Sequence, residues 1–143
     1  MEKLWRIAPW FVRLILVPPT FIFGMIATRY ILHPAQNAAM VGIALTSPLG
    51  ATIARVGLGG FPLACSLFTL WCLISRRRVL TGLTFVTILV SAVLAVRAFG
   101  IAVDGTAAQS MHLVRVEAIL LTVFVAGLAM ELTRRRRQPL HAA

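Results

Sequence analysis

Two runs of basic residues stand out in this 143-residue chain, and long apolar stretches precede the first run and separate it from the second. The first run is Arg76 to Arg78, and the second is Arg134 to Arg137. A helix needs about 20 apolar residues to cross the hydrocarbon core of a bilayer, and each stretch is long enough. Within lipid the backbone must satisfy its own hydrogen bonds, which favours helices. The sequence therefore predicts an all-α integral membrane protein.

Composition supports lipid as the solvent of this chain. Hydrophobic residues make up 59% of it and charged residues 13%, whereas soluble domains are roughly one quarter charged. A net charge of +10 is typical of nucleic-acid binding in a soluble protein. Here the arginines bracket apolar spans, so we expect them to set the membrane orientation instead. The expected partners are membrane lipids and either a membrane protein or a second copy of the chain, with no nucleic acid.

Four spans are expected in a single transmembrane domain that forms a four-helix bundle. Pro18 and Pro19 interrupt the first span, which predicts either one kinked helix or an interfacial segment followed by a steeper span. Residues 34–40 should form a short surface helix in the outer connection, and Ser47 with Pro48 should cap the second span. The short loop after span two predicts that spans two and three are antiparallel neighbours. The expected spans are about 5–32, 48–74, 79–103 and 106–133, followed by a basic cytoplasmic tail at 134–143.

The orientation follows from the basic residues outside the spans. With four crossings, Lys3 and Arg6 lie on the same side as both arginine runs. Lysine and arginine are enriched in cytoplasmic loops, so this side should be the cytoplasm. Both termini are then expected in the cytoplasm, and the connections after spans one and three face outward.

Orientation does not explain the charges in the outer part of the spans. Ionisable groups inside a membrane cost about 2.5–3.5 kcal/mol each on insertion scales, so they are candidates for function. Glu117 lies about 16 Å along its helix from Thr106, too deep to reach the headgroups, and should pair with Arg55 or Arg97. Arg97 and Asp104 share a helix face, which leaves a direct pair between them open. The candidate ligand-binding set is Arg55, Arg97, Asp104, Arg115 and Glu117.

Three functions remain open for this charged cluster. An ion-pair network could fix helix register in an accessory or scaffold subunit, which is the function expected first. An excess of arginine could instead bind a lipid, a quinone or another anionic amphiphile in a binder or carrier. In a small membrane enzyme of the isomerase or cyclase type, Glu117 would be the acid/base, with Asp104 as a second candidate. Catalytic residues stay unassigned, because no nucleophile and base occur at a recognisable spacing.

The sequence predicts no metal site and no cofactor. His33 and His112 lack the further ligands that a zinc site requires. Cys65 and Cys72 lie seven residues apart in one span, about 10 Å along the axis, which is too far for a disulfide. We expect both cysteines to serve as small packing residues.

Short motifs occur in order over about residues 20–133: Pro34, Gly42-Ile43, Arg55 before Gly59-Gly60, Arg97 before Asp104-Gly105, and Glu117. This order resembles a family of small bacterial four-helix inner-membrane proteins of unknown function, broadly DoxX-like. The resemblance implies a bacterial inner-membrane bundle with a charged cluster near its outer face. DoxX-like relatives are linked to membrane redox subunits, and this link implies partners that work at the level of quinones. An acid often precedes the arginine of span two in that pattern, and residues 51–54 offer none, so Arg55 needs another partner.

Overall fold

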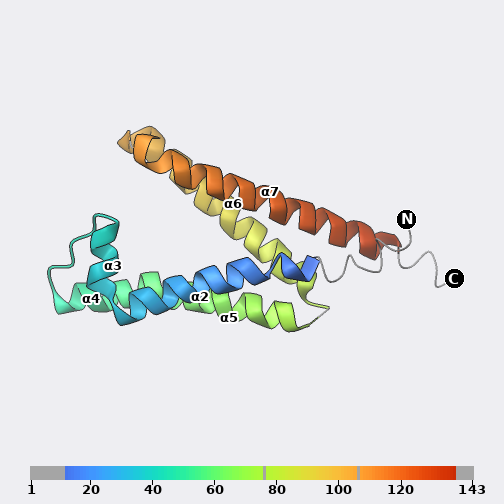
Figure 1. Ribbon diagram of the computed structural model, residues 1–143, viewed down its shortest axis with the longest axis horizontal. Coiled ribbons are helices and arrows are strands. Elements are labelled where there is room, and N and C mark those ends of the chain that lie inside the picture. Colours follow the sequence, from blue (N-terminus) through green and yellow to red (C-terminus); the bar gives the residue numbers. More distant parts are fainter. Residues whose placement is uncertain (1–11, 76, 106, 138–143) are drawn as a thin grey trace. The chain divides into compact units, whose positions relative to one another are not determined.

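The computed structural model describes residues 12–75, 77–105 and 107–137, and this part of the chain is helical with short connections and no strand. Four helices are long and apolar enough to cross a membrane, as the sequence predicts. They divide between two compact units (Figure 1). Leu16–Ile74 form one unit, and Ser75 onward forms the other together with the segment that ends at Ile15. The four candidate spans are Val12–Leu32, Pro48–Ile74, Val79–Asp104 and Ser110–Arg136.

The Leu16–Ile74 unit is a helical hairpin with an irregular outer end. Its long helices α2 and α5 pack side by side, and α3 contacts both α2 and α4 at one end (Figure 1). The second span is not a uniform α-helix, because a π-helical segment, η1, joins α4 to α5. The elements are α2 (Val17–Leu32), α3 (Pro34–Met40), α4 (Pro48–Ala54), η1 (Arg55–Gly60) and α5 (Phe61–Ile74).

Hydroxyl groups join α2 to α5. The Thr20 hydroxyl donates to the hydroxyl of Thr69 at 3.0 Å, and Ser66 donates to the Thr20 carbonyl at 2.9 Å. Thr69 is fully buried and donates in turn to the carbonyl of Cys65 at 2.9 Å. Membrane helices lack a hydrophobic drive to associate, so small residues and interhelical hydrogen bonds hold them together.

The second helix–helix contact of this unit depends on Gly59 in η1. A Cβ atom at this position would lie 2.8 Å from Ile31 Cγ1 and 3.3 Å from the Ile31 backbone nitrogen. The π-helical segment thus approaches α2 more closely than any residue with a side chain allows. Gly57, in the same segment, has open space around it.

The connection between α2 and α4 follows the predicted local chemistry. Residues 34–40 form helix α3 with Pro34 in its first turn, as predicted. The Ser47 hydroxyl accepts a hydrogen bond from the Gly50 amide at 3.0 Å, and Pro48 is the first residue of α4. The predicted cap of the second span is therefore confirmed.

The other unit is an antiparallel hairpin of α6 (Val79–Asp104) and α7 (Ala107–Arg137). Gly105 ends α6 in the left-handed conformation, with φ of 67°, where glycine carries no steric penalty. Gly127 on α7 leaves room for the side chain of Ile15, since a Cβ atom there would lie 2.7 Å from Ile15 Cδ1, and Leu83 on α6 packs at an ordinary distance of 3.6 Å.

Two boundaries differ from the predicted spans. A turn at residues 15–16 precedes α2, which starts at Val17 and carries Pro18 and Pro19 in its first turn, where their missing N–H groups cost nothing. The chain passes from one unit to the other at this break. Helix α7 continues to Arg137, past the predicted end of the span at about 133. Thr106, where the fourth span was expected to start, and the segment before Val12 lie outside the described residues.

The two glycines of η1 provide a matched test of the α2–η1 contact. Gly59→Ala should lower the free energy of unfolding by about 1–3 kcal/mol, because the added methyl group overpacks the contact with Ile31. Gly57→Ala should be neutral or slightly stabilising, because alanine favours helix by about 0.5–1 kcal/mol. Thermal unfolding in detergent, followed by circular dichroism, measures both. Equal effects of the two substitutions would contradict close packing at Gly59.

Candidate functional site

Arg97 on α6 and Glu117 on α7 form an ion pair across the second hairpin. Arg97 Nη2 lies 2.6 Å from Glu117 Oε1, and Arg97 Nε donates to Oε2 at 2.8 Å. The side chains are 28% and 16% exposed. The sequence predicted that Glu117 pairs with Arg55 or Arg97, and in the structure its partner is Arg97. The geometry is bidentate, which is the strongest arrangement of a guanidinium and a carboxylate.

The hairpin turn brings these two residues to the same level. Arg97 precedes the α6 terminus at Asp104, and Glu117 follows the start of α7 by a comparable length of helix. Both oxygens of Glu117 accept hydrogen bonds from one guanidinium. A general acid or base must reach the reacting group of a substrate. The Glu117 carboxylate points at Arg97 instead.

The other two charges of the predicted set in this hairpin do not join the pair. Asp104 and Arg115 are both exposed, and neither makes an ion pair within the described residues. The direct Arg97–Asp104 pair that the sequence left open is therefore not formed here. Within this unit, only Arg97 and Glu117 of the predicted set come together.

Arg55 belongs to the Leu16–Ile74 unit and has a carbonyl partner rather than an acid. Its Nε donates to the carbonyl of Ile31 in the last turn of α2 at 3.1 Å. Asn37 caps the same helix end, and its Nδ2 donates to the carbonyls of Arg29 and His33 at 2.9 and 2.7 Å. The last carbonyls of a helix lack partners within it and carry partial negative charge. A cation there is stabilising, which gives Arg55 a structural role.

An open depression lies on the surface of α6 beside the ion pair. It has a volume of about 380 Å³ and is lined by Ala92, Val93, Val96 and Arg97. These positions recur on one face of the helix. Arg97 is the polar member of an otherwise apolar lining, and the Glu117 bonds use its Nε and Nη2. The depression offers an apolar surface next to a guanidinium.

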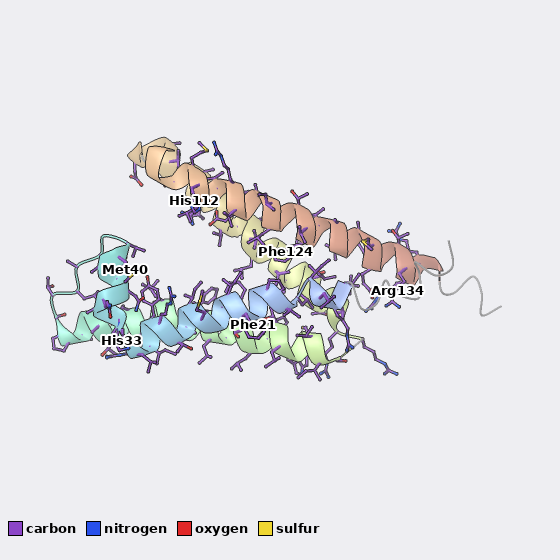
Figure 2. The ribbon with its side chains drawn as sticks, viewed as in Figure 1. Phe21, His33, Met40, His112, Phe124 and Arg134 are labelled. Carbon is purple, nitrogen blue, oxygen red and sulfur yellow. The ribbon has the colours of Figure 1, made fainter. Side chains whose placement is uncertain are left out.

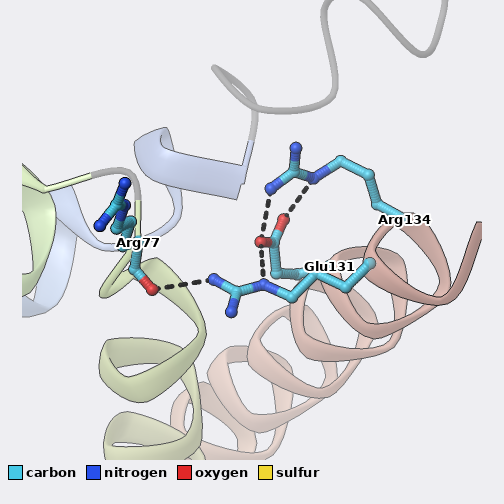
Figure 3. A network of polar contacts seen from close by, with 4 residues as sticks. Arg77, Glu131 and Arg134 are labelled. Carbon is cyan, nitrogen blue, oxygen red and sulfur yellow. Dashed lines mark hydrogen bonds and ion pairs between the residues drawn. The ribbon is translucent and has the colours of Figure 1, made fainter. Parts of the chain in front are cut away.

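A second charged network, at the other end of the hairpin, was not predicted as a site. Glu131 lies three and four residues before Arg134 and Arg135, a spacing typical of exposed helix pairs, but its side chain is only 1% exposed. Arg134 Nη2 and Nε donate to its two oxygens at 2.7 and 2.8 Å, and Arg135 Nε donates at 2.9 Å (Figure 3). Arg135 Nη2 also donates to the carbonyl of Arg77, at 2.9 Å, in the loop before α6.

The burial of Glu131 could not be read from helix spacing alone. Positions i, i+3 and i+4 share a helix face, which predicts contact with Arg134 and Arg135. The Arg135–Arg77 hydrogen bond also brings the loop before α6 against the end of α7, a long-range contact that helix spacing does not predict. The two arginine runs were the available signal, because a four-crossing topology places them at the same end.

Potential metal ligands do not gather in the part of the chain that the structure describes. No group of three His, Cys, Asp or Glu side chains could hold an ion there. His33 follows α2 in one unit and His112 lies on α7 in the other (Figure 2). Cys65 and Cys72 are buried and not joined in a disulfide.

Comparison with protein-family models, with curated proteins and with solved structures finds no match for this chain. Function therefore has to be argued from the charges and surfaces of the two hairpins. Those charges divide into a pair at Arg97, a helix cap at Arg55 and a network at Glu131.

Proposed function

We propose that this chain is a small integral membrane protein of the bacterial inner membrane that acts as a non-catalytic accessory or scaffold subunit. The observation that carries the proposal is the bidentate Arg97–Glu117 ion pair. Both carboxylate oxygens of Glu117, the first candidate for acid/base chemistry, accept hydrogen bonds from an arginine of the neighbouring helix. Removing either partner would leave a charge unpaired in an apolar environment, so the pair fixes the register of α6 against α7.

The remaining paired charges have structural roles as well. Arg55 caps α2, and Glu131 holds two arginines at the end of α7. In each case the partner lies in the same hairpin, within a few ångströms. A site evolved for turnover would present at least one such group to a substrate.

The exposed faces of the long helices suit contact with lipid or another membrane protein. Large apolar side chains are exposed on all four, and this surface is unfavourable in water. A scaffold subunit uses such faces to meet a membrane protein partner or a second copy of itself. Examples are Phe21 on α2, Leu67 on α5, Phe99 on α6 and Ile119 on α7.

A second candidate function is a binder or carrier of a lipid, quinone or other anionic amphiphile. The α6 depression favours it, because Ala92, Val93 and Val96 would contact an apolar chain while Arg97 would meet a carbonyl or anionic head. No observation favours the isomerase or cyclase alternative. The DoxX-like assignment stays a prediction.

Native mass spectrometry from mild detergent separates the scaffold from the binder. Wild type should be compared with Glu117→Gln and with Val96→Phe, which fills the depression without touching the ion pair. We expect no bound small mass that Val96→Phe removes, whether the chain appears alone or with a protein partner. Glu117→Gln should be less stable, because it removes the charge that neutralises Arg97.

A defined small mass on wild type that Val96→Phe removes would contradict the scaffold proposal and establish the binder. Arg115→Gln is the matched control for Glu117→Gln, because Arg115 is exposed and makes no ion pair within the described residues. Circular dichroism on every sample shows that each variant is folded.

The proposed orientation places both termini in the cytoplasm, since this puts both arginine runs inside. Cysteines introduced as Thr46→Cys and Ala142→Cys, each in a Cys65→Ala/Cys72→Ala background, test it. A membrane-impermeant maleimide should label Thr46→Cys in intact cells with a permeable outer membrane, and Ala142→Cys only after lysis. The opposite labelling would contradict the orientation.

A further inference from the structure

Arginines gather at one end of the α6–α7 hairpin, where the loop before α6 meets the last turns of α7. We call these residues the basic end: Arg77, Arg78, Arg134, Arg135 and Arg136, with Glu131. The hydrogen bond from Arg135 to the Arg77 carbonyl joins the two segments (Figure 3). Among the described residues, this end thus carries five guanidinium groups and one carboxylate, that of Glu131. Structural pairing with Glu131 explains only two of the five.

The length of the helices places the basic end at headgroup depth. Helix α7 has 31 residues, which corresponds to about 46 Å at 1.5 Å per residue. A bilayer measures about 40–45 Å including its headgroup regions. The Arg134–Arg137 run closes this helix, so it lies near the level of the lipid phosphates when α7 spans the membrane.

Glu131 and the Arg77 carbonyl hold two guanidinium groups in place while leaving part of each accessible. Arg134 and Arg135 remain 22% and 37% exposed. Their bonds to Glu131 use Nε of both residues and Nη2 of Arg134, so the Nη1 groups are not engaged in these bonds. Arg77 and Arg136 are exposed beside them. The result is a fixed pair of cations flanked by two freer ones.

We propose that the basic end binds the headgroup of an anionic phospholipid. Guanidinium groups bind phosphate oxygens through two parallel hydrogen bonds, and fixed groups lose less entropy on binding. Clusters of four or more basic residues next to a membrane-spanning helix are typical of anionic lipid recognition. A zwitterionic headgroup carries its own cation and gains less from this excess of positive charge. The inference goes beyond the scaffold function and requires only that the hairpin spans a membrane.

The test measures lipid preference with two matched double variants. Wild-type protein in neutral detergent is titrated with phosphatidylglycerol or phosphatidylcholine, and bound lipid is counted by native mass spectrometry. Wild type should bind phosphatidylglycerol about tenfold more tightly or better. Arg77→Gln/Arg136→Gln should lose most of this preference. Arg29→Gln/Arg115→Gln removes the same charge from exposed arginines elsewhere and should retain it.

Two results of the lipid titration would overturn the proposal, and a competition experiment gives a third. One is an equal loss in both double variants, which would mean that net charge alone attracts the lipid. The other is an absence of preference in wild type. Glycerol phosphate is added as a competitor, and displacement of the lipid at equimolar concentration would show a site for soluble phosphate instead. If the double variant at the basic end fails to fold, Arg136→Gln alone against Arg115→Gln makes the same comparison.

Discussion

The cost of an unpaired charge in an apolar medium governs this molecule. An ionised group in the membrane interior loses its hydration, so it must find its partners within the protein or move to the interface. Arg97 and Glu117 satisfy each other across α6 and α7 at 2.6 Å. Their positions fix how the two helices slide and rotate against one another, because any other register would separate the charges. Breaking such a pair costs more than the pair itself contributes, since one charge stays buried alone.

The two hairpins solve the problem of helix association differently. In the Leu16–Ile74 unit, Gly59 allows close approach and the Thr20, Ser66 and Thr69 hydroxyls bridge α2 and α5. In the α6–α7 unit, the Arg97–Glu117 ion pair joins the two helices, and at the other end Arg135 on α7 donates to the Arg77 carbonyl before α6. Small residues hold helices by dispersion and tolerate many neighbours, whereas ion pairs specify one register. A scaffold subunit needs defined spacing between its own helices before it can present a constant face to a partner.

Sequence reasoning predicted the elements well, because hydropathy and local turn chemistry specify them. The four spans, the α3 helix and the Ser47 cap all follow from residues close together in the chain. The prediction that spans two and three are antiparallel neighbours concerns helices in different units, so it stays a prediction.

Longer-range features were not predictable in the same way. The π-helical segment at Arg55–Gly60 has no hydrophobic periodicity that distinguishes it in the sequence. The close contact of Gly59 with Ile31 likewise joins residues far apart in the chain. Arg55 was expected to need an acid, but the carbonyls at the end of a helix serve equally well as acceptors. Glu131 is buried, and Arg135, which donates to it, also donates to the carbonyl of Arg77 in a loop far earlier in the chain. Spacing along one helix cannot reveal such contacts.

A charge-swap cycle on Arg97 and Glu117 tests the central claim most directly, namely that this pair is structural. Arg97→Glu and Glu117→Arg should each lower stability strongly, since two like charges then face each other. The double variant Arg97→Glu/Glu117→Arg should regain most of the loss, with a coupling energy of about 1–3 kcal/mol in reversible unfolding in detergent. Additive losses, with no recovery in the double variant, would contradict the account and show that each charge acts through some other partner.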